Sequence, residues 1–310
     1  YDWVGGQADL KARRIRTIGA PERRFGEDRL RLLRAVRFAA QLGFEVESET
    51  FAAVRQHAVA ICEVSAERIR EELLKLFRPP YAARGLNLLQ DSLLLSEVMP
   101  ELAATIGCEQ PLEHHPEGDV FLHIRLMLEH LSHDAGATLI WSVLLHDIAK
   151  PLMQTCDEGR IRFLNYEKVG ADMSLEIMNR LRFPKSVSSA VQICVHKHMQ
   201  LKDAQQMRRA KLRKLFLRPT FPVELELNRL DSLASSGRLA NFEYLQAKFV
   251  EFQNQPELQQ PLIKGADLIA LGQAPGPGLG KLLDDIRNRQ LDGELATRDQ
   301  ALAYAREVSG

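Results

Sequence analysis

Residues 16–44 read RTIGAPERRFGEDRLRLLRAVRFAAQLGF, and this segment carries the clearest helical pattern in the chain. Its apolar side chains recur at the 3.6-residue spacing of one helix face, at Leu32, Leu33, Val36, Ala39 and Ala40. Gly43 follows the last of them, as glycine commonly does at a helix end. The pattern therefore predicts a helix that starts near residue 26 and ends at Gly43.

Charged side chains gather on the opposite face of this predicted helix. Glu27, Arg31 and Arg34 project together there, and Asp28 lies at their margin. The two acids are expected in the first turn, where the helix dipole favours negative charge. On charge spacing alone, the pattern favours a solvated face with ion pairs worth about 0.2–0.5 kcal/mol each.

The rest of the chain reads as mostly helical. Ser65 is a candidate N-cap, and Pro79-Pro80 a stop, for the first of a further series of helices. These are predicted at 67–77, 82–94, 119–132, 137–149, 167–181, 186–198, 207–217 and 222–235. Strand-like residues occur only at the start, at 8–12 and 14–18, and we expect them to join a sheet supplied by preceding residues. The predicted fold class is mainly α.

Composition sets the broad class of protein. The 310 residues correspond to roughly two domains at about 100–200 residues each. Lysine plus arginine and aspartate plus glutamate both number 41, so any nucleic-acid surface must be a local patch. Four separated cysteines without CxxC spacing indicate reduced thiols. With neither an apolar run of about 20 residues nor a signal peptide, we expect a cytoplasmic protein without a membrane contact.

Two further segments carry chemistry-bearing residues. Residues 114–123 read HHPEGDVFLH and residues 144–151 read LLHDIAKP, although a lone His-Asp dipeptide is weak evidence for a metal site. Residues 207–218 read MRRAKLRKLFLR, a basic helix with an apolar face. Its Arg208, Lys211 and Lys214 either follow RNA phosphates or form a solvated face, and the charge pattern does not separate the two.

A family resemblance rests on VGGQADL (4–10), IRTIG (15–19) and PERRFGEDRLRLLRAVRFAAQLGF (21–44). These segments resemble the end of the catalytic region and the neck of bacterial tRNA nucleotidyltransferases (CCA-adding enzymes) and poly(A) polymerases. In that family an E-D-x-x-R motif reads the base of the incoming nucleotide. The resemblance places the motif on Glu27, Asp28 and Arg31, with Glu27 orienting Arg31, and adds Arg34 as a support of the arginine cluster or a phosphate contact.

The chemistry of this assignment can be stated independently. Cytosine and adenine both carry an exocyclic amine beside a ring nitrogen that accepts hydrogen bonds. The Asp28 carboxylate can accept from the amine while the Arg31 guanidinium donates to the ring nitrogen. Uracil and guanine place a carbonyl where the amine would be, and leaving the carboxylate unpaired costs about 1–3 kcal/mol.

The resemblance also implies residues that lie outside this chain. Transfer in the family needs a glycine-rich loop and a pair of aspartates that hold Mg²⁺. Asp2 and Asp9 do not form such a pair. The chain starts without methionine and reads as a piece of a longer protein, so we expect an upstream nucleotidyltransferase head and no transfer by this chain alone. The implied partners of the whole enzyme are CTP, ATP and the 3′ end of tRNA or another RNA.

Residues 113–245 resemble the HD phosphohydrolase domain that many CCA-adding enzymes carry after the neck. The resemblance implies His123, His146, Asp147 and Asp231 as ligands of a divalent metal. The chain departs from the pattern at Asn165-Tyr166-Glu167 and at His196-Lys197-His198, where Tyr166 and Lys197 replace expected ligands. The competing interpretation is a helical scaffold without metal, in which Asp147 and His123 hydrogen-bond to each other.

These observations predict four parts: a head remnant (1–22), a neck (23–112), an HD-like helical domain (113–250) and a helical tail (251–310). The leading hypothesis is the C-terminal portion of a CCA-adding tRNA nucleotidyltransferase, because the related poly(A) polymerases typically lack the HD segment. The alternatives are a poly(A) polymerase of the same family, a metal-dependent HD phosphohydrolase acting on 2′,3′-cyclic or 2′-phosphates, and a tRNA-binding module without catalysis.

Overall fold

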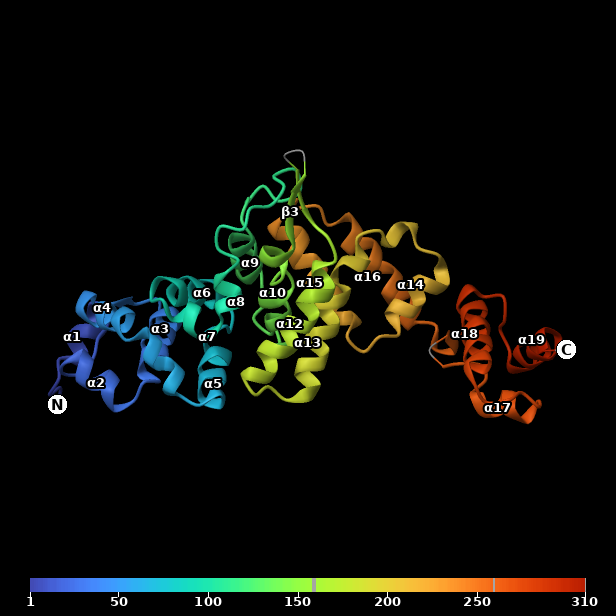
Figure 1. Cartoon of the computed structure of the whole chain (residues 1–310), viewed down its shortest axis with the longest axis horizontal. Coiled ribbons are helices and arrows are strands. Elements are labelled where there is room, and N and C mark those ends of the chain that lie inside the picture. Colours follow the sequence, from blue (N-terminus) through green and yellow to red (C-terminus); the bar gives the residue numbers. More distant parts are fainter. Residues whose placement is uncertain (158–159, 259, 310) are drawn as a thin grey trace. The chain divides into compact units, whose positions relative to one another are not determined.

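The computed structural model describes residues 1–157, 160–258 and 260–309, and these form a mostly helical protein (Figure 1). The prediction of a mainly α fold is confirmed. The chain divides into two compact units. The first unit comprises Tyr1–Met199 and Glu226–Arg238, and the second comprises Gln200–Leu225 and the residues from Leu239 onward. The four-part division drawn from the sequence stays a prediction.

The N-terminal half of the first unit is built around α3 (Arg31–Leu42), which packs against α5 (Ala66–Leu76) and α6 (Ala82–Asp91). The apolar stripe Leu32, Leu33, Val36, Ala39 and Ala40 is buried, as the sequence predicts. The remaining elements here are α1 (Gly6–Lys11), β1 (Arg14–Ile15), α2 (Pro21–Glu27), β2 (Glu45–Val46), α4 (Ser48–Gln56), η1 (Ala58–Glu63), α7 (Leu94–Val98) and α8 (Pro100–Ala103).

Of the two strands predicted at the start of the chain, the one over 8–12 is wrong and the one over 14–18 is shorter than expected. Residues 8–12 lie largely in the helix α1, because the Asp2 carboxylate accepts hydrogen bonds from the backbone N–H groups of Gly6 (2.9 Å) and Gln7 (2.8 Å) and so satisfies the helix start. The strand expected over 14–18 shortens to β1. It pairs in parallel with β2, which follows α3 in the chain. The expectation that preceding residues extend this sheet stays a prediction.

The single helix predicted from residue 26 is two helices, α2 and α3. Asp28 lies between them with an extended backbone (φ −155°, ψ 107°), and its side-chain oxygen accepts the N–H of Leu30 at 3.2 Å. Such local bonds from aspartate compete with the helical hydrogen-bond ladder. Glu27 is therefore the last residue of α2, and the expectation that both acids occupy a first turn is wrong. The predicted end at Gly43 is confirmed by its φ of 63°.

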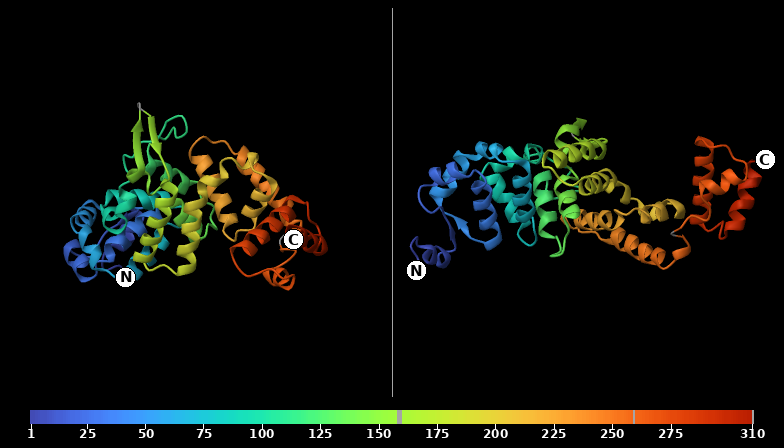
Figure 2. Two further views of the ribbon diagram at one scale, coloured as in Figure 1. Left: turned by 45° about the vertical axis from the view of Figure 1, so that its right-hand side comes forward. Right: turned by 90° about the horizontal axis from the view of Figure 1, so that it is seen from below.

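The rest of the first unit forms a helical body that carries a hairpin. Figure 1 and the left view of Figure 2 both show this hairpin, β3 (Gln154–Asp157) with β4 (Arg160–Phe163), extending away from the helices. All four residues of β3 are exposed, so no apolar alternation marks the strand in the sequence. The helices are α9 (Val120–Glu129), α10 (Ala137–Leu145), α11 (Lys150–Met153), α12 (Tyr166–Arg180) and α13 (Lys185–Lys197). Two further helices, η2 (His198–Leu201) and α15 (Phe221–Ala234), each begin in one unit and end in the other.

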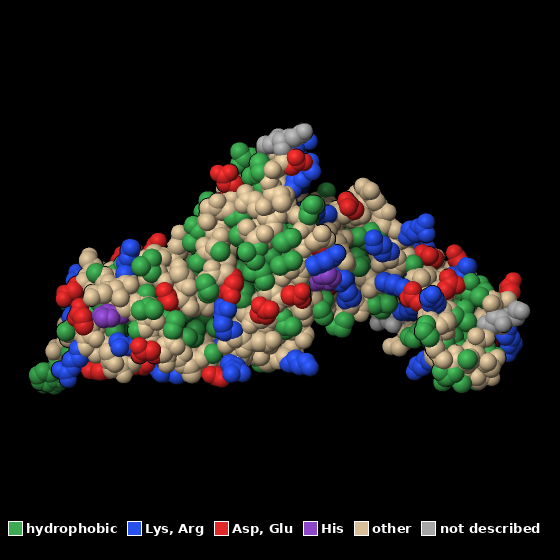
Figure 3. All heavy atoms as spheres, viewed as in Figure 1, with side chains coloured by type: hydrophobic (Ala, Val, Ile, Leu, Met, Phe, Trp, Pro, Cys, Tyr) green, Lys and Arg blue, Asp and Glu red, His purple; other side chains and the backbone are tan. Residues whose placement is uncertain are grey.

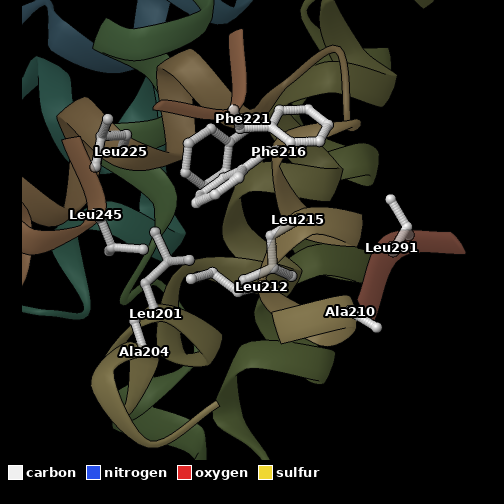
Figure 4. Close-up of a cluster of buried hydrophobic side chains, with 11 residues drawn as sticks. Leu201, Ala204, Ala210, Leu212, Leu215, Phe216, Phe221, Leu225, Leu245 and Leu291 are labelled. Atoms are coloured by element: carbon white, nitrogen blue, oxygen red, sulfur yellow. The ribbon is translucent and has the colours of Figure 1, made fainter. Parts of the chain in front are cut away.

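The second unit has an aromatic core of its own. Phe216 and Phe221 meet edge to face with ring centroids 5.0 Å apart, and leucines surround them (Figure 4). A separate cluster around Leu268, Ile286 and Ala301 holds the last helices together. The elements are η3 (Ala204–Gln206), α14 (Arg209–Phe216), α16 (Ala240–Gln253), η4 (Pro256–Leu258), α17 (Gly265–Ala270), α18 (Pro277–Asp292) and α19 (Arg298–Ser309).

The surface agrees with the balanced composition. Figure 3 shows basic and acidic side chains interspersed over the face in view. Among the described residues, no helix combines the length and the apolar composition needed to cross a membrane. Within the described residues, the four cysteines form no disulfide bond.

Candidate nucleotide and metal sites

A pocket of about 360 Å³ lies beside the junction of α2 and α3. Its lining, within the described part of the chain, contains no acidic residue. It consists of Arg16, Arg24, Arg31, Arg34, Thr17, Thr50 and the apolar residues Ile15, Ile18, Phe25, Ala35 and Phe38. Four guanidinium groups beside aromatic rings suit a ligand that combines a flat ring with hydrogen-bond acceptors or negative charge. Two predicted site residues, Arg31 and Arg34, therefore border an open pocket.

Glu27 holds the arginines of this pocket in place. Its carboxylate accepts hydrogen bonds from Arg31 (2.7 Å) and Arg24 (2.5 Å), and the Arg31 guanidinium also donates to the Arg24 carbonyl (2.8 Å). The hydrogen bond from Arg31, with the nearby charge of Arg24, lowers the pKa of Glu27 below its ordinary value. The contact expected between Glu27 and Arg31 is thus present.

Asp28 does not lie against Arg31, contrary to the arrangement expected from the sequence. Its carboxylate oxygens accept from Nη2 of Arg68 at 3.0 and 3.2 Å, and Asp28 does not line the pocket. The break between α2 and α3 turns its side chain toward α5. Although partial burial raises the pKa of Asp28, the hydrogen bond from Arg68 outweighs it and the pKa is lowered. Arg68 lies 40 residues further along the chain, and no sequence signal identified it as a partner.

The predicted metal ligands come together in the helical body. His123 lies on α9, His146 directly follows α10, and Asp231 lies on α15. His123 Nε2 is 3.2 Å from Asp231 Oδ1, and one ligand atom from each of these three residues lies within 4.8 Å of the others. Asp147 joins them, with Oδ2 3.2 Å from His146 Nε2. We call these four residues the histidine cluster.

The free atoms of the histidine cluster fit a divalent metal. Within the described residues, His146 Nε2 and Asp147 Oδ1 are buried without a hydrogen-bond partner, and buried His123 Nε2 lies 3.2 Å from Asp231 Oδ1. Nδ1 of His146 lies 2.9 Å from the Val143 carbonyl, and Nδ1 of His123 lies 2.6 Å from Glu117 Oε1. Metal-binding histidines usually keep a proton on one ring nitrogen and offer a lone pair on the other. A metal at Nε2 of His123 therefore displaces the proton that its Asp231 and Glu117 contacts favour, and the Nδ1 proton stays on the contact to Glu117.

Glu117 supports this cluster and was missed by the sequence reasoning. Its Oε1 contacts Nδ1 of both His123 and His115, the latter at 2.9 Å. Burial raises the pKa of Glu117, but the two histidines lower it to about 2. Burial lowers the pKa of His123, but Asp231 and Glu117 raise it to about 9. The spacing of His115, Glu117 and His123 in HHPEGDVFLH was the available signal.

Lys150 is the second residue that the sequence reasoning missed. Its ammonium is 5% exposed, lies 2.6 Å from Asp147 Oδ2 and also contacts the Gln110 side chain. Burial would raise the pKa of Asp147, but His146 and Lys150 together hold it well below its ordinary value. The scaffold interpretation paired Asp147 with His123; the structure instead pairs Asp147 with Lys150.

Tyr166 and His198 close one side of the cluster. The Tyr166 hydroxyl lies 2.9 Å from His198 Nε2, and His198 Nδ1 lies 2.6 Å from the Val195 carbonyl. Burial lowers the pKa of His198 to about 4, so the imidazole is neutral at pH 7. Tyr166 therefore engages the histidine nitrogen that would otherwise face the cluster.

The predicted RNA-binding residues border a pocket of about 460 Å³ in the second unit. Arg208 is the N-cap of α14, and Lys211 and Lys214 follow on that helix. The pocket is also lined by residues on or just after α18: Asp285, Asn288, Arg289, Asp292 and Glu294. Lys214 Nζ additionally lies 2.6 Å from Asp284. The three basic residues thus lie together, but acids flank them, and their role in RNA binding stays a prediction.

Comparisons with known proteins match nearly the whole chain. Residues 43–106 match the family described as "Probable RNA and SrmB- binding site of polymerase A". The chain is 34% identical over 321 residues to a CC-adding tRNA nucleotidyltransferase of Thermus thermophilus, covering 97% of the chain and 73% of that protein. It is also 34% identical over 320 residues to an A-adding tRNA nucleotidyltransferase of Deinococcus radiodurans, covering 98% and 73%.

Solved structures agree on the fold. The Bacillus stearothermophilus CCA-adding enzyme in complex with CTP aligns with a TM-score of 0.71 and 23% identity, over 100% of this chain and 69% of that one. The Thermotoga maritima CCA-adding enzyme complexed with tRNA aligns with a TM-score of 0.53 and 17% identity, over 100% and 67%. At these identities the alignments establish a shared fold.

Proposed function

The chain belongs to the tRNA nucleotidyltransferase family, and from this premise we propose that it selects the incoming nucleotide and binds RNA during addition of C and A to a tRNA 3′ end. It is part of a nucleotide-transferring enzyme. Relatives of equal identity are named for adding CC and for adding A, and a multifunctional CCA protein of Pseudomonas paraeruginosa, also 34% identical over 77% of this chain, supports addition of both bases. Addition of A alone to other RNAs is the alternative within the family.

One observation carries the proposal for nucleotide selection: Arg31 borders an open pocket and is fixed there by Glu27 and the Arg24 carbonyl. A guanidinium that is already oriented loses little freedom when it donates to a ring nitrogen. Asp28, three residues before it, supplies the acceptor for the exocyclic amine of cytosine or adenine. Arg34 lines the same pocket and supports binding of a phosphate.

Transfer itself requires groups that we assign to another part of the protein. Family chemistry is metal-dependent, and we place its Mg²⁺-binding carboxylates in a nucleotidyltransferase head upstream of Tyr1, with CTP and ATP as substrates. RNA binding is assigned to the neck, where residues 43–106 match the RNA-binding family, and to Arg208, Lys211 and Lys214. We expect tRNA affinity to fall steeply with salt, because phosphate contacts release counterions.

The test of nucleotide selection is the substitution Asp28→Ala in the protein that carries the head. We expect discrimination against UTP and GTP to fall roughly 10- to 100-fold, the loss of one discriminating contact. The matched control is Asp91→Ala, an exposed acid at the end of α6. Incorporation of nucleotides from all four triphosphates, in single-turnover assays, measures the ratio. Unchanged discrimination in Asp28→Ala would contradict the assignment, and addition of A alone would identify the poly(A) alternative.

The histidine cluster is proposed to hold one divalent cation. His123, His146, Asp147 and Asp231 are the ligands, and Glu117 orients His123. Such an ion, when bound, polarises a phosphate oxygen or lowers the pKa of a water. Calorimetric titration with Mn²⁺ tests the site: we expect one ion per chain, lost in His146→Ala and retained in the exposed control His130→Ala. Binding unchanged in His146→Ala would refute the site. The names of the relatives describe nucleotide addition, so phosphohydrolysis is carried no further.

A further inference from the structure

Asp28 forms an ion pair with Arg68 of α5. Both carboxylate oxygens accept from one guanidinium nitrogen of Arg68, at 3.0 and 3.2 Å. Arg68 is 52% exposed and Asp28 26% exposed, so water competes with this ion pair. Within the described part of the chain, the Leu30 N–H is the one further hydrogen-bond donor to this carboxylate. The Asp28 side chain is therefore held by weak contacts.

The nucleotide pocket is incomplete in this arrangement. Its lining, as far as the structure describes it, includes Arg31 but neither Asp28 nor any other acid. Glu27 cannot replace Asp28, because its carboxylate accepts hydrogen bonds from two arginines of the pocket, Arg24 and Arg31, and also pairs with Arg23. The hydrogen-bond donor for a cytosine or adenine base, Arg31, therefore lines the pocket, whereas the acceptor, Asp28, lies outside it.

We propose that Arg68 is a positioning residue that holds the Asp28 carboxylate outside the pocket, and that a cytosine or adenine base draws it in by offering its exocyclic amine. This inference rests on the proposed role of Asp28 in nucleotide selection. Asp28 lies between α2 and α3 and belongs to neither helix. Rotation of its side chain breaks only the contacts to Arg68 and Leu30 and leaves both helices intact. Uracil and guanine offer no amine in that place and leave Asp28 with Arg68.

The size of the effect follows from the exposure of the pair. Exposed ion pairs are weak, so the restraint reduces apparent nucleotide affinity by about two- to five-fold at most. Removing Arg68 is therefore expected to lower KM for CTP and ATP by that factor. The chemical step is unaffected, because Arg68 contacts neither the pocket nor the reacting groups, and kcat stays unchanged.

The experiment compares Arg68→Gln with the wild type in the protein that carries the head. The matched control is Arg306→Gln, which removes the same charge from an exposed arginine on α19, outside residues 43–106. We expect KM for CTP and ATP to fall about two- to five-fold in Arg68→Gln alone. Arg68→Lys keeps the charge and should lie between the two. In an Asp28→Asn background the same substitution at position 68 should change nothing, which a merely structural role would not predict.

Two results would refute the proposal that Asp28 leaves Arg68 for the base. An unchanged or raised KM in Arg68→Gln means that Arg68 does not restrain Asp28. An equal effect with and without the Asp28 carboxylate means that Arg68 acts through another group. The proposed function is tested separately by Asp28→Ala. If that variant loses base discrimination while Arg68→Gln is silent, only the restraint is refuted; if both are silent, the proposed function falls as well.

Discussion

The substitution Lys150→Met tests whether the Lys150 ammonium stabilises the buried Asp147 carboxylate of the histidine cluster. Lys150 is 4% exposed, and its ammonium lies 2.6 Å from Asp147 Oδ2 and about 5 Å above two aromatic rings, 5.4 Å from Phe163 and 5.3 Å from Tyr166. Methionine fills a similar volume without the charge. Asp147, which is 1% exposed, then keeps His146 and His198 beside it and the contact to the Tyr166 hydroxyl, but loses its ammonium partner.

The magnitude follows from the burial of the pair. Removing one partner of a buried ion pair costs about 3–5 kcal/mol, because the other charge remains uncompensated. For a unit of roughly 200 residues, each kcal/mol shifts Tm by about 2–4 °C, so Lys150→Met should lower Tm by roughly 6–20 °C. A divalent cation on Asp147 replaces the missing charge. At 100 times its Kd, such an ion stabilises the fold by about 2.7 kcal/mol.

The assay is thermal unfolding followed by circular dichroism, with and without Mn²⁺ and in parallel with Lys185→Met. Lys185 is exposed at the start of α13, so its substitution should change stability by no more than about 0.5 kcal/mol. We expect Mn²⁺ to raise Tm more in Lys150→Met than in the wild type, since the lysine and the cation compete for the same carboxylate. Equal Tm values for the two variants would refute the buried pair. An equal Mn²⁺ response would show that Asp147 is not a ligand.

Further predictions concern packing, titration and capping. A Cβ at Gly85 would lie 2.9 Å from two carbons of buried Leu76, so Gly85→Ala should lower the free energy of unfolding by about 1–3 kcal/mol, measured with urea. The control Gly280→Ala, whose Cβ meets nothing within 4 Å, should leave it unchanged, and equal unfolding midpoints for the two variants would contradict close packing at Gly85. His198 should titrate near pH 4 in imidazole NMR spectra, and titration near 6.5 would contradict its burial. Its contribution to the free energy of unfolding is present above its ordinary pKa of 6.5 and is lost as the pH falls toward 4. Asp119→Ala removes the side-chain cap of α9 and should cost about 1 kcal/mol of unfolding free energy, and an unchanged value would show that the cap is not needed.

Apolar periodicity predicted most helices of the body within a few residues. The segment 82–94 became Ala82–Asp91, and 186–198 became Lys185–Lys197. Such helices follow from local pattern because one face must be buried. The strands predicted at the start of the chain differ from the structure because their conformation depends on contacts outside the local sequence. Asp2 caps α1, and the partner of β1 lies beyond α3, so both outcomes depend on contacts that local propensity does not contain.

The candidate sites show the same division. The resemblance located His123, His146 and Asp231, which are far apart in the sequence but adjacent in the structure. The groups that support the sites could not be found in that way. Lys150 becomes a partner of Asp147 one helical turn away only once both are buried, and Arg68 reaches Asp28 only because the chain breaks between α2 and α3. Gly26 was a local sign of a weak helix, but it did not place the break.

The ion pair of Asp147 is buried and the ion pair of Asp28 is exposed, and this difference bears on their proposed functions. In the histidine cluster the ion pair of Asp147 and Lys150 is at most 5% exposed, so breaking it leaves a charge that water cannot reach. Beside the break between α2 and α3, Arg68 is 52% exposed, so a released Arg68 is solvated at once and the free-energy cost of separating it from Asp28 is small. A site that must accept two different bases needs side chains that change partners cheaply. A site that holds one ion needs ligands that keep their positions. The location of Asp28 at an exposed break between helices, and of Asp147 within a buried body, therefore follows from what each carboxylate is proposed to do.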